Sequence, residues 1–145
     1  MKKEVSLLMV VKDNKILLFK RSETDESNPG KWAMIGGGVD PGETPEQALT
    51  REVKEEAGVF LQNFTNLKRY EYGNVILNVF YTNTFDDASI KLNKEHSEYK
   101  YFTKEELENE KNTISTNIQF MNDYNKVAKK EQKLQEHLNQ IKRLL

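Results

Sequence analysis

The chain has 145 residues, with 22 basic and 23 acidic side chains and no cysteine. This length suits one domain over residues 1–145, and the absence of cysteine excludes disulfides, thiolate zinc sites and a thiol nucleophile. A net charge of −1 gives no general attraction to nucleic acid or an anionic membrane, and no apolar run could span a bilayer, so we expect a cytoplasmic protein with neither partner.

Apolar runs near the start of the chain predict a β-hairpin. Residues 5–11 and 16–19 are apolar, and the Asp13-Asn14 pair between them is typical of a turn. Residues 22–31 form a polar loop with a turn signal at Asn28-Pro29-Gly30. A short strand is expected over 32–35, and the three glycines at 36–38 are expected to end regular structure there.

The clearest helix signal begins at Thr44. Proline follows at the first helical position, Gln47 completes a capping box, and Gly58 stands where a C-cap glycine belongs, so a helix is predicted over 45–57. Two strands are then predicted, over 64–72 and 75–85. A further strand over 99–102 precedes a second capping box, which begins at Thr103, and a short helix.

The C-terminal segment, about 113–145, is predicted to be helical from residue 116 onward and to lie outside a core of about 1–110. Its apolar residues recur at alternating steps of three and four, with Glu131 as the one polar interruption: Phe120, Tyr124, Val127, Leu134, Leu138, Ile141 and Leu145. A helix that packs against the domain explains this stripe. A stripe so narrow is also typical of a coiled-coil seam, so a homodimer through the C-terminal helix is the alternative.

Three carboxylates gather on one side of the helix predicted over 45–57. At about 100° per residue, Glu52 and Glu56 share a face, and Glu55 lies about 60° to the other side of Glu52. One interpretation is a solvated acidic face paired with neighbouring basic residues. The other is a divalent-cation site, because Mg²⁺ prefers carboxylate oxygens and keeps waters and substrate phosphates as its other ligands.

The spacing around these carboxylates resembles the signature of the Nudix hydrolases. Every specified position of that signature is filled: Gly37, Glu43, Arg51, Glu52, Val53, Glu55, Glu56, Gly58 and Val59. Average residue frequencies give such a match by chance in about one of ten million chains of this kind. The resemblance implies an α/β fold, the Nudix-type α/β/α sandwich with a mixed, partly antiparallel sheet, here extended by a long C-terminal helix.

The resemblance also implies a metal-dependent catalytic site. Glu52, Glu55 and Glu56 would be the catalytic carboxylates and the ligands of Mg²⁺, for which Mn²⁺ can substitute. Gly37, in the glycine loop, would aim a backbone carbonyl at the metal. Glu52 is the candidate for the base that accepts a proton from the attacking water.

Other signature residues would be structural. Glu43 precedes the helix and would reach back to Arg51, which pins the loop to the helix, while Gly58 would end the helix. The sequence departs from many relatives at Ile35, where they carry proline before the paired glycines. This difference alters loop geometry or substrate preference but removes no ligand.

Four residues outside the signature each have a functional and a simpler structural interpretation. Arg21 ends a predicted strand where many relatives carry a phosphate-binding arginine, or it is a strand-end charge. Trp32 stacks on a base or belongs to the core. Glu95, with Glu98 in reserve, resembles a downstream glutamate that completes the metal site or acts as base in relatives. The alternative for both glutamates is an exposed acidic loop.

The resemblance implies a Mg²⁺-dependent hydrolase in which water attacks phosphorus in the diphosphate linkage of a small-molecule nucleotide. A nucleoside or deoxynucleoside triphosphate is the first candidate substrate. A dinucleoside polyphosphate is the second, suggested by Glu95-His96 and Tyr99, and ADP-ribose or another nucleotide sugar is the third. A nucleotide-binding module without catalysis is the alternative from another class, although no signature glutamate is missing. His96 is expected at the surface or behind the metal ligands, and His137 is expected to be inert.

Overall fold

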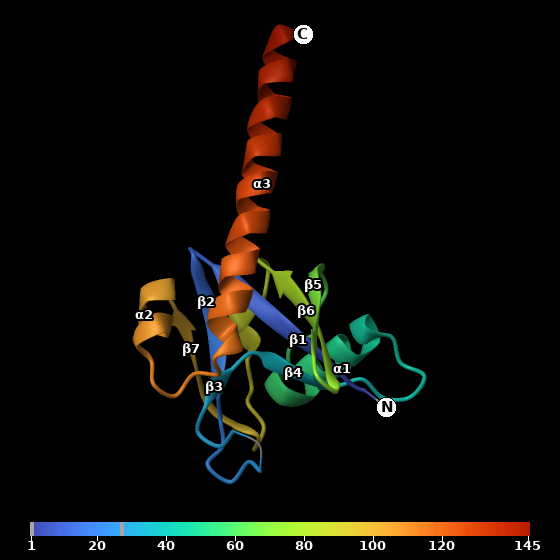
Figure 1. Ribbon diagram of the computed structural model, residues 1–145, viewed down its shortest axis with the longest axis vertical. Helices are drawn as coiled ribbons and strands as arrows, with labels where there is room; N and C mark the ends of the chain where they lie inside the picture. Colours follow the sequence, from blue (N-terminus) through green and yellow to red (C-terminus); the bar gives the residue numbers. More distant parts are fainter. Residues whose placement is uncertain (1, 27) are drawn as a thin grey trace.

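A mixed sheet forms the centre of the computed structural model, which describes residues 2–26 and 28–145 (Figure 1). Its order is β3-β2-β1-β6-β5, with β4 paired to β1 and β7 paired to β2. β1 and β6 run parallel, and the other pairs run antiparallel. The strands in the described part are β1 (Lys3–Lys12), β2 (Lys15–Arg21), β3 (Trp32–Ala33), β4 (Ile35–Gly38), β5 (Thr65–Tyr72), β6 (Val75–Thr82) and β7 (His96–Phe102).

The predicted hairpin is present as β1 and β2. Its two turn residues, Asp13 and Asn14, have φ values of 50° and 62°. Positive φ at both central residues is the requirement of the two-residue turn whose twist matches that of paired strands, and Asn and Asp tolerate it. The turn chemistry therefore sets the register of the strand pair that carries Arg21.

Helices cover both faces of the sheet, as the α/β/α prediction requires. α1 (Pro45–Ala57) lies on one face, where Leu49 and Val53 pack with alternate residues of β1 and β2. α2 (Lys104–Asn109) and the start of α3 (Thr116–Leu144) lie on the other, where Leu107 and Phe120 are buried. The alternation of strand side chains between two apolar cores confirms the fold class.

Local signals place α1 as predicted. The Thr44 side chain accepts a hydrogen bond from the Gln47 backbone N–H, and the Gln47 side chain accepts one from the Thr44 backbone N–H, so the capping box is complete. At the other end Gly58 adopts the left-handed conformation, with φ of 69°, and its N–H bonds the Lys54 carbonyl. These caps fix the ends of the helix that carries the acidic residues.

The glycine segment differs from the prediction, because residues 36–38 continue a strand instead of ending regular structure. They belong to β4, which pairs antiparallel with β1, Gly36 opposite Leu7 and Gly37 opposite Ser6. Gly36 has φ of 151°, and a Cβ there would collide with the Ser6 carbonyl oxygen. The glycines thus permit a close strand contact. Ile35, where relatives carry proline, is fully buried beside α1.

Two other segments differ in extent. β6 ends at Thr82 and a short 3₁₀ turn, η1 (Asp87–Ser89), follows, where a strand was predicted to residue 85. β7 begins at His96, three residues before the predicted start at 99. This earlier start brings His96 into the sheet.

α3 has a docked part and a projecting part (Figure 1). Phe120 and Met121 are buried, and Tyr81 of β6 donates a hydrogen bond to Glu131 at 3.0 Å. Beyond Glu131 every residue of the helix is exposed, including Leu134, at 60%. In the described residues no helix combines the length and apolarity needed to cross a bilayer.

Candidate active site

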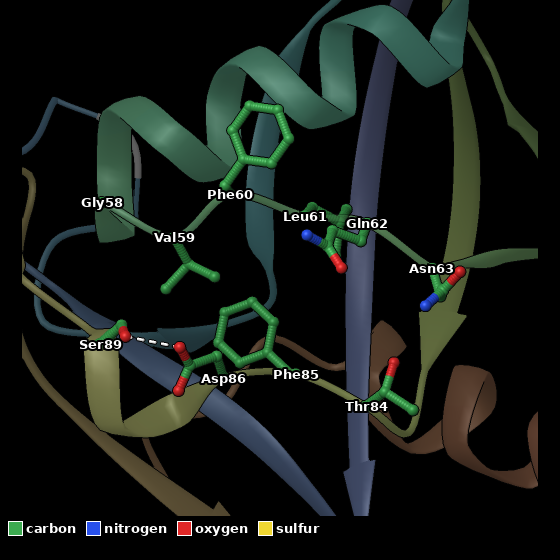
Figure 2. A pocket seen from close by; sticks show the side chains of 10 residues that line it. All are labelled: Gly58, Val59, Phe60, Leu61, Gln62, Asn63, Thr84, Phe85, Asp86 and Ser89. Carbon is green, nitrogen blue, oxygen red and sulfur yellow. Dashed lines mark hydrogen bonds between the residues drawn. The ribbon is translucent and has the colours of Figure 1, made fainter.

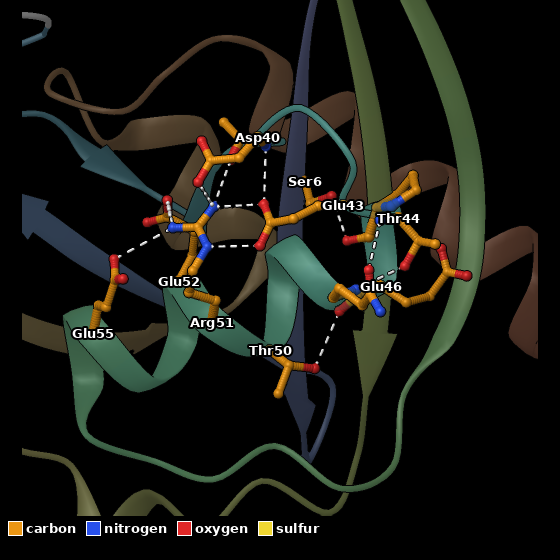
Figure 3. Close-up of polar contacts among 12 residues, drawn as sticks. Ser6, Asp40, Glu43, Thr44, Glu46, Thr50, Arg51, Glu52 and Glu55 are labelled. Atoms are coloured by element: carbon orange, nitrogen blue, oxygen red, sulfur yellow. Dashed lines mark hydrogen bonds and ion pairs between the residues drawn. The ribbon is translucent and has the colours of Figure 1, made fainter.

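Arg51 is the centre of an ionic network that joins α1 to the preceding loop (Figure 3). Its Nε and Nη2 donate to the two carboxylate oxygens of Glu43 at 2.8 and 2.9 Å, and Nη2 also donates to the Gly38 carbonyl at 2.9 Å. Hydrogen bonds from Arg51 and from the Asp40 N–H lower the pKa of Glu43 to about 2. The expected contact between Glu43 and Arg51 is therefore present, and it holds the loop against the helix.

The same guanidinium also positions Glu52. Arg51 Nη1 donates to Glu52 Oε1 at 2.8 Å, and the Glu52 side chain is 15% exposed. A Cβ at Gly37 would lie only 2.6 Å from Glu52 Oε2, so glycine leaves the space that this carboxylate occupies. Burial raises the pKa of Glu52 despite the lowering effect of Arg51. Glu55, at 3.5 Å from Arg51 Nη1, is much more exposed.

Glu56 is the most deeply buried of the three α1 carboxyls, at 6% exposure. Its Oε2 accepts a hydrogen bond from the Gly36 N–H at 3.1 Å, and the carboxyl also shares a hydrogen bond with Glu95. Burial, followed by that bond to Glu95, raises the pKa of Glu56 to about 9. Two carboxyls at hydrogen-bond distance repel each other when both are charged, and a divalent cation between them relieves this repulsion.

A third potential ligand, His96, lies beside these two carboxyls. One ligand atom from each of Glu56, Glu95 and His96 lies within 4.8 Å of the others. Glu52 lies against Gly37, next to the Gly36 N–H that binds Glu56, so its carboxylate borders the same space. The residues present therefore fit a divalent cation: several carboxylate oxygens and one imidazole converge beside the backbone of β4.

His96 is buried at 6% exposure beside Glu56 and Glu95, which excludes the surface and agrees with the other predicted position, next to the metal ligands. The physical reason is a β-bulge: Lys20 pairs with Glu98, but Arg21 pairs with His96, and Ser97 is the extra residue. The bulge moves His96 to the face that carries Phe19 and α1, and the two rings lie 5.7 Å apart. Burial lowers the pKa of His96, with a further contribution from Arg21.

The structure places the other predicted residues unevenly. Arg21 lies beside His96, with Nη2 3.0 Å from Asp25 Oδ2 and with a buried Nε that makes no hydrogen bond. Trp32 is only 7% exposed and packs edge-on against Phe102, with centroids 5.0 Å apart, which favours its core role over base stacking. Glu98 is exposed on β7 and lies outside the cluster that contains Glu95.

A pocket of about 490 Å³ adjoins the C-terminal end of α1 (Figure 2). It lies between the segment after α1 and the segment after β6. The aromatic rings of Phe60 and Phe85 line it, and so do the side-chain amides of Gln62 and Asn63. The pocket is separate from the acidic site, because its lining includes none of the four carboxylates Glu52, Glu55, Glu56 and Glu95.

Comparison with known proteins identifies the family. Residues 2–124 match the family described as NUDIX domain. The nucleoside triphosphatase NudI of Escherichia coli is 32% identical over 114 residues, which cover 68% of this chain and 80% of the relative. The chain belongs to the Nudix family.

Solved Nudix structures show the same fold. The MutT protein from Methanosarcina mazei has a TM-score of 0.75 and 26% identity, covering 88% of this chain and 96% of that one. The MutT Nudix hydrolase from Burkholderia pseudomallei has a TM-score of 0.72 and 25% identity, covering 85% of this chain and 98% of that one. Both the family and the fold implied by the signature are therefore confirmed, and the protein is a Nudix hydrolase.

Proposed function

We propose that this Nudix hydrolase cleaves the diphosphate linkage of a nucleoside or deoxynucleoside triphosphate with Mg²⁺ as cofactor. The observation that carries the proposal is the convergence of Glu52, Glu56 and Glu95 beside the glycines of β4. The name of the Escherichia coli relative, a nucleoside triphosphatase, supports this substrate class.

The carboxylates of α1 and the downstream loop would hold the cofactor. In this proposal the central ligands are Glu52, Glu56 and Glu95, and the Gly37 carbonyl is a backbone ligand. The more exposed Glu55 would bind the ion from the solvent side. When bound, the divalent ion neutralises the diphosphate and lowers the pKa of a coordinated water. Mn²⁺ is accepted as a substitute because it also takes oxygen ligands.

Protein groups around these ligands would orient the reaction. Arg51 holds Glu52 in place from one side, and the Gly36 N–H holds Glu56 from the other. Glu52 is the proposed acceptor of the proton lost by the attacking water. Arg21 lies next to the Glu95 loop, whose carbonyl accepts a hydrogen bond from the Ser22 N–H at 2.9 Å, and we assign Arg21 to the substrate phosphates.

A nucleotide panel tests the proposal. Common and oxidised nucleoside triphosphates, diadenosine polyphosphates and ADP-ribose are incubated with Mg²⁺ in ¹⁸O-labelled water, and the products are identified by mass. We expect a triphosphate to be cleaved to monophosphate and pyrophosphate, with one ¹⁸O in one product, as attack on a diphosphate phosphorus requires.

Two carboxylate variants serve as a matched pair. Glu56→Gln is expected to reduce turnover at least 100-fold, since about this much is lost when one catalytic group is removed. Glu98→Gln changes an exposed carboxylate outside the cluster and is expected to leave turnover unchanged. Turnover of a dinucleoside polyphosphate or ADP-ribose alone would contradict the triphosphate assignment, and turnover that survives Glu56→Gln would contradict the carboxylate site.

A further inference from the structure

The His96 imidazole is buried, yet its hydrogen-bonding capacity is not used fully. His96 is only 6% exposed, and its Nδ1 makes no hydrogen bond. Leaving a buried polar atom without a partner destabilises a fold, so such an atom commonly has a ligand or a function. The contact with the Phe19 ring explains how the imidazole packs, but it gives the Nδ1 atom no hydrogen-bond partner.

The neighbours of His96 are suited to a metal. A ligand atom of His96 lies within 4.8 Å of those of Glu56 and Glu95, which small side-chain movements reduce to the roughly 4 Å between opposite ligands of one ion. The bulge at Ser97 is what turns the imidazole to this side of the sheet. Bulges of this kind commonly re-aim a side chain at a functional site.

The donor set sets a preference among metals. Mg²⁺ favours oxygen ligands only, whereas Mn²⁺, Co²⁺ and Zn²⁺ accept imidazole nitrogen together with carboxylates. We infer that His96 is a nitrogen ligand of the catalytic cation and that the site, although it works with Mg²⁺, binds a first-row transition ion such as Mn²⁺ more tightly. This inference rests on the proposed metal-dependent function and names a ligand that the family signature does not contain.

Pulsed EPR of the Mn²⁺-loaded protein tests this without any activity assay. A directly bound imidazole modulates the electron spin echo of Mn²⁺ through its nitrogen. His96 and His137 are the only histidines in the chain, so growth with ¹⁵N-histidine labels few nitrogens. We expect ¹⁴N modulation in the unlabelled protein and its replacement by a ¹⁵N pattern after labelling.

Variants identify which histidine is responsible. His96→Gln is expected to remove the modulation and to weaken Mn²⁺ binding at least tenfold, with a smaller effect on Mg²⁺. His137→Gln, on the projecting part of α3, is the matched control and is expected to change neither. The labelling experiment uses the wild-type protein, so it gives a result even if a variant does not fold.

The outcomes separate the two proposals. Mn²⁺ bound without histidine nitrogen coupling would overturn the role of His96 and leave the carboxylate site intact. Failure of both Mn²⁺ and Mg²⁺ to bind would overturn both. Coupling that persists in His96→Gln but disappears in His137→Gln would also overturn the assignment.

A second, independent observation concerns the distal arm, residues 132–145 of the chain. Leu134, Leu138, Ile141 and Leu145 are exposed at 60%, 43%, 43% and 100%, and they follow alternating steps of four and three. Such a narrow stripe suits another helix better than a membrane surface, which needs a wider apolar face.

The steps between these four residues are symmetric, so a second copy of this chain in antiparallel orientation places each of them against an apolar residue. That orientation sets Leu134 against Leu145 of the second copy and Leu138 against its Ile141, with Gln135 beside Lys142. In a parallel pair the stripe would continue into Glu131, which each copy already uses to accept a hydrogen bond from its own Tyr81. The geometry points to weak antiparallel self-association through the distal arm, since four apolar layers bury less than a stable dimer requires.

Sedimentation velocity across a concentration series tests this association. We expect the average mass to rise with concentration, and the rise to disappear in a Leu138→Gln, Ile141→Gln double variant. The chain has no cysteine, so single cysteines report the orientation by oxidative cross-linking. Leu134→Cys mixed with Leu145→Cys is expected to cross-link, whereas Leu134→Cys alone is not, because antiparallel helices separate its two copies by about 16 Å. A monomer at every concentration, or efficient cross-linking of Leu134→Cys alone, would overturn the proposal.

Discussion

Replacing Glu56 by glutamine is expected to stabilise the metal-free protein while it destroys activity. Protonated Glu56 accepts from the Gly36 N–H and shares a hydrogen bond with Glu95. Glutamine has the same shape, and its amide supplies one acceptor and one donor for these two partners. The variant therefore keeps the contacts of the protonated carboxyl but never has to bind a proton.

The magnitude follows from linkage. The pKa of Glu56 is raised from 4.5 to about 9, so between these values the folded state binds a proton that the unfolded state has lost. The contribution of Glu56 to stability is thus complete below pH 4.5 and is lost as pH rises toward about 9, at about 1.4 kcal/mol per pH unit. At pH 7.5 the loss reaches about 4 kcal/mol, which corresponds to about 10 °C in Tm for a domain of this size.

Thermal unfolding in EDTA from pH 5.5 to 8.5 measures this effect. We expect the Tm of Glu56→Gln to exceed that of the wild type by a margin that widens with pH. Glu98→Gln, with its carboxyl exposed on β7, should follow the wild-type curve. Parallel curves for wild type and Glu56→Gln, or a less stable variant at pH 7.5, would refute the argument that burial and Glu95 keep the proton on Glu56. Adding Mg²⁺ or Mn²⁺ should then stabilise the wild type and not the variant, because binding to the folded state adds to its stability.

Three further substitutions have defined outcomes. Gly37→Ala places a Cβ 2.6 Å from Glu52 Oε2 and is expected to lower kcat about 100-fold, whereas Gly38→Ala meets nothing within 4 Å and should retain activity in the same assay. Arg51→Lys cannot bridge Glu43, Glu52 and the Gly38 carbonyl with one ammonium, so kcat/KM should fall at least about tenfold, and unchanged kinetics would contradict the positioning role. Tyr70→Phe removes the 2.6 Å hydrogen bond from the buried Tyr70 to Asp123 of α3 and should lower Tm by about 2–4 °C, equivalent to about 1 kcal/mol; Tyr72→Phe, at a more exposed bond to Gln119, is the control and should have a smaller effect.

Features encoded by neighbouring residues were predictable from the sequence. The ends of α1 depend on Thr44, Gln47 and Gly58, which act within one or two turns of the helix, and the hairpin depends on Asp13 and Asn14. The acidic face of α1 likewise follows from helical spacing alone.

Features that depend on distant partners were not predictable in the same way. The glycines of β4 form a strand because β1 lies beside them, and a glycine-rich segment carries no local signal of that contact. The face on which His96 lies depends on a bulge in its pairing with β2, and strict alternation from Phe102 would have put His96 on the opposite face. The raised pKa of Glu56 depends in part on Glu95, almost forty residues further along the chain.

The contacts between the glycine segment and α1 show how the residues of the signature depend on one another. Written along the chain, the signature is a series of separate requirements divided by gaps of variable residues. In the fold, three pairs of residues, here called braces, join the segment before α1 to the helix: Gly37 with Glu52, Glu43 with Arg51, and Gly36, which directly precedes the signature, with Glu56. Each brace has one member on either side, so the cost of altering one member depends on whether the other is still there. Paired substitutions within a brace should therefore be less damaging than the product of the single ones, whereas pairs taken from different braces should multiply.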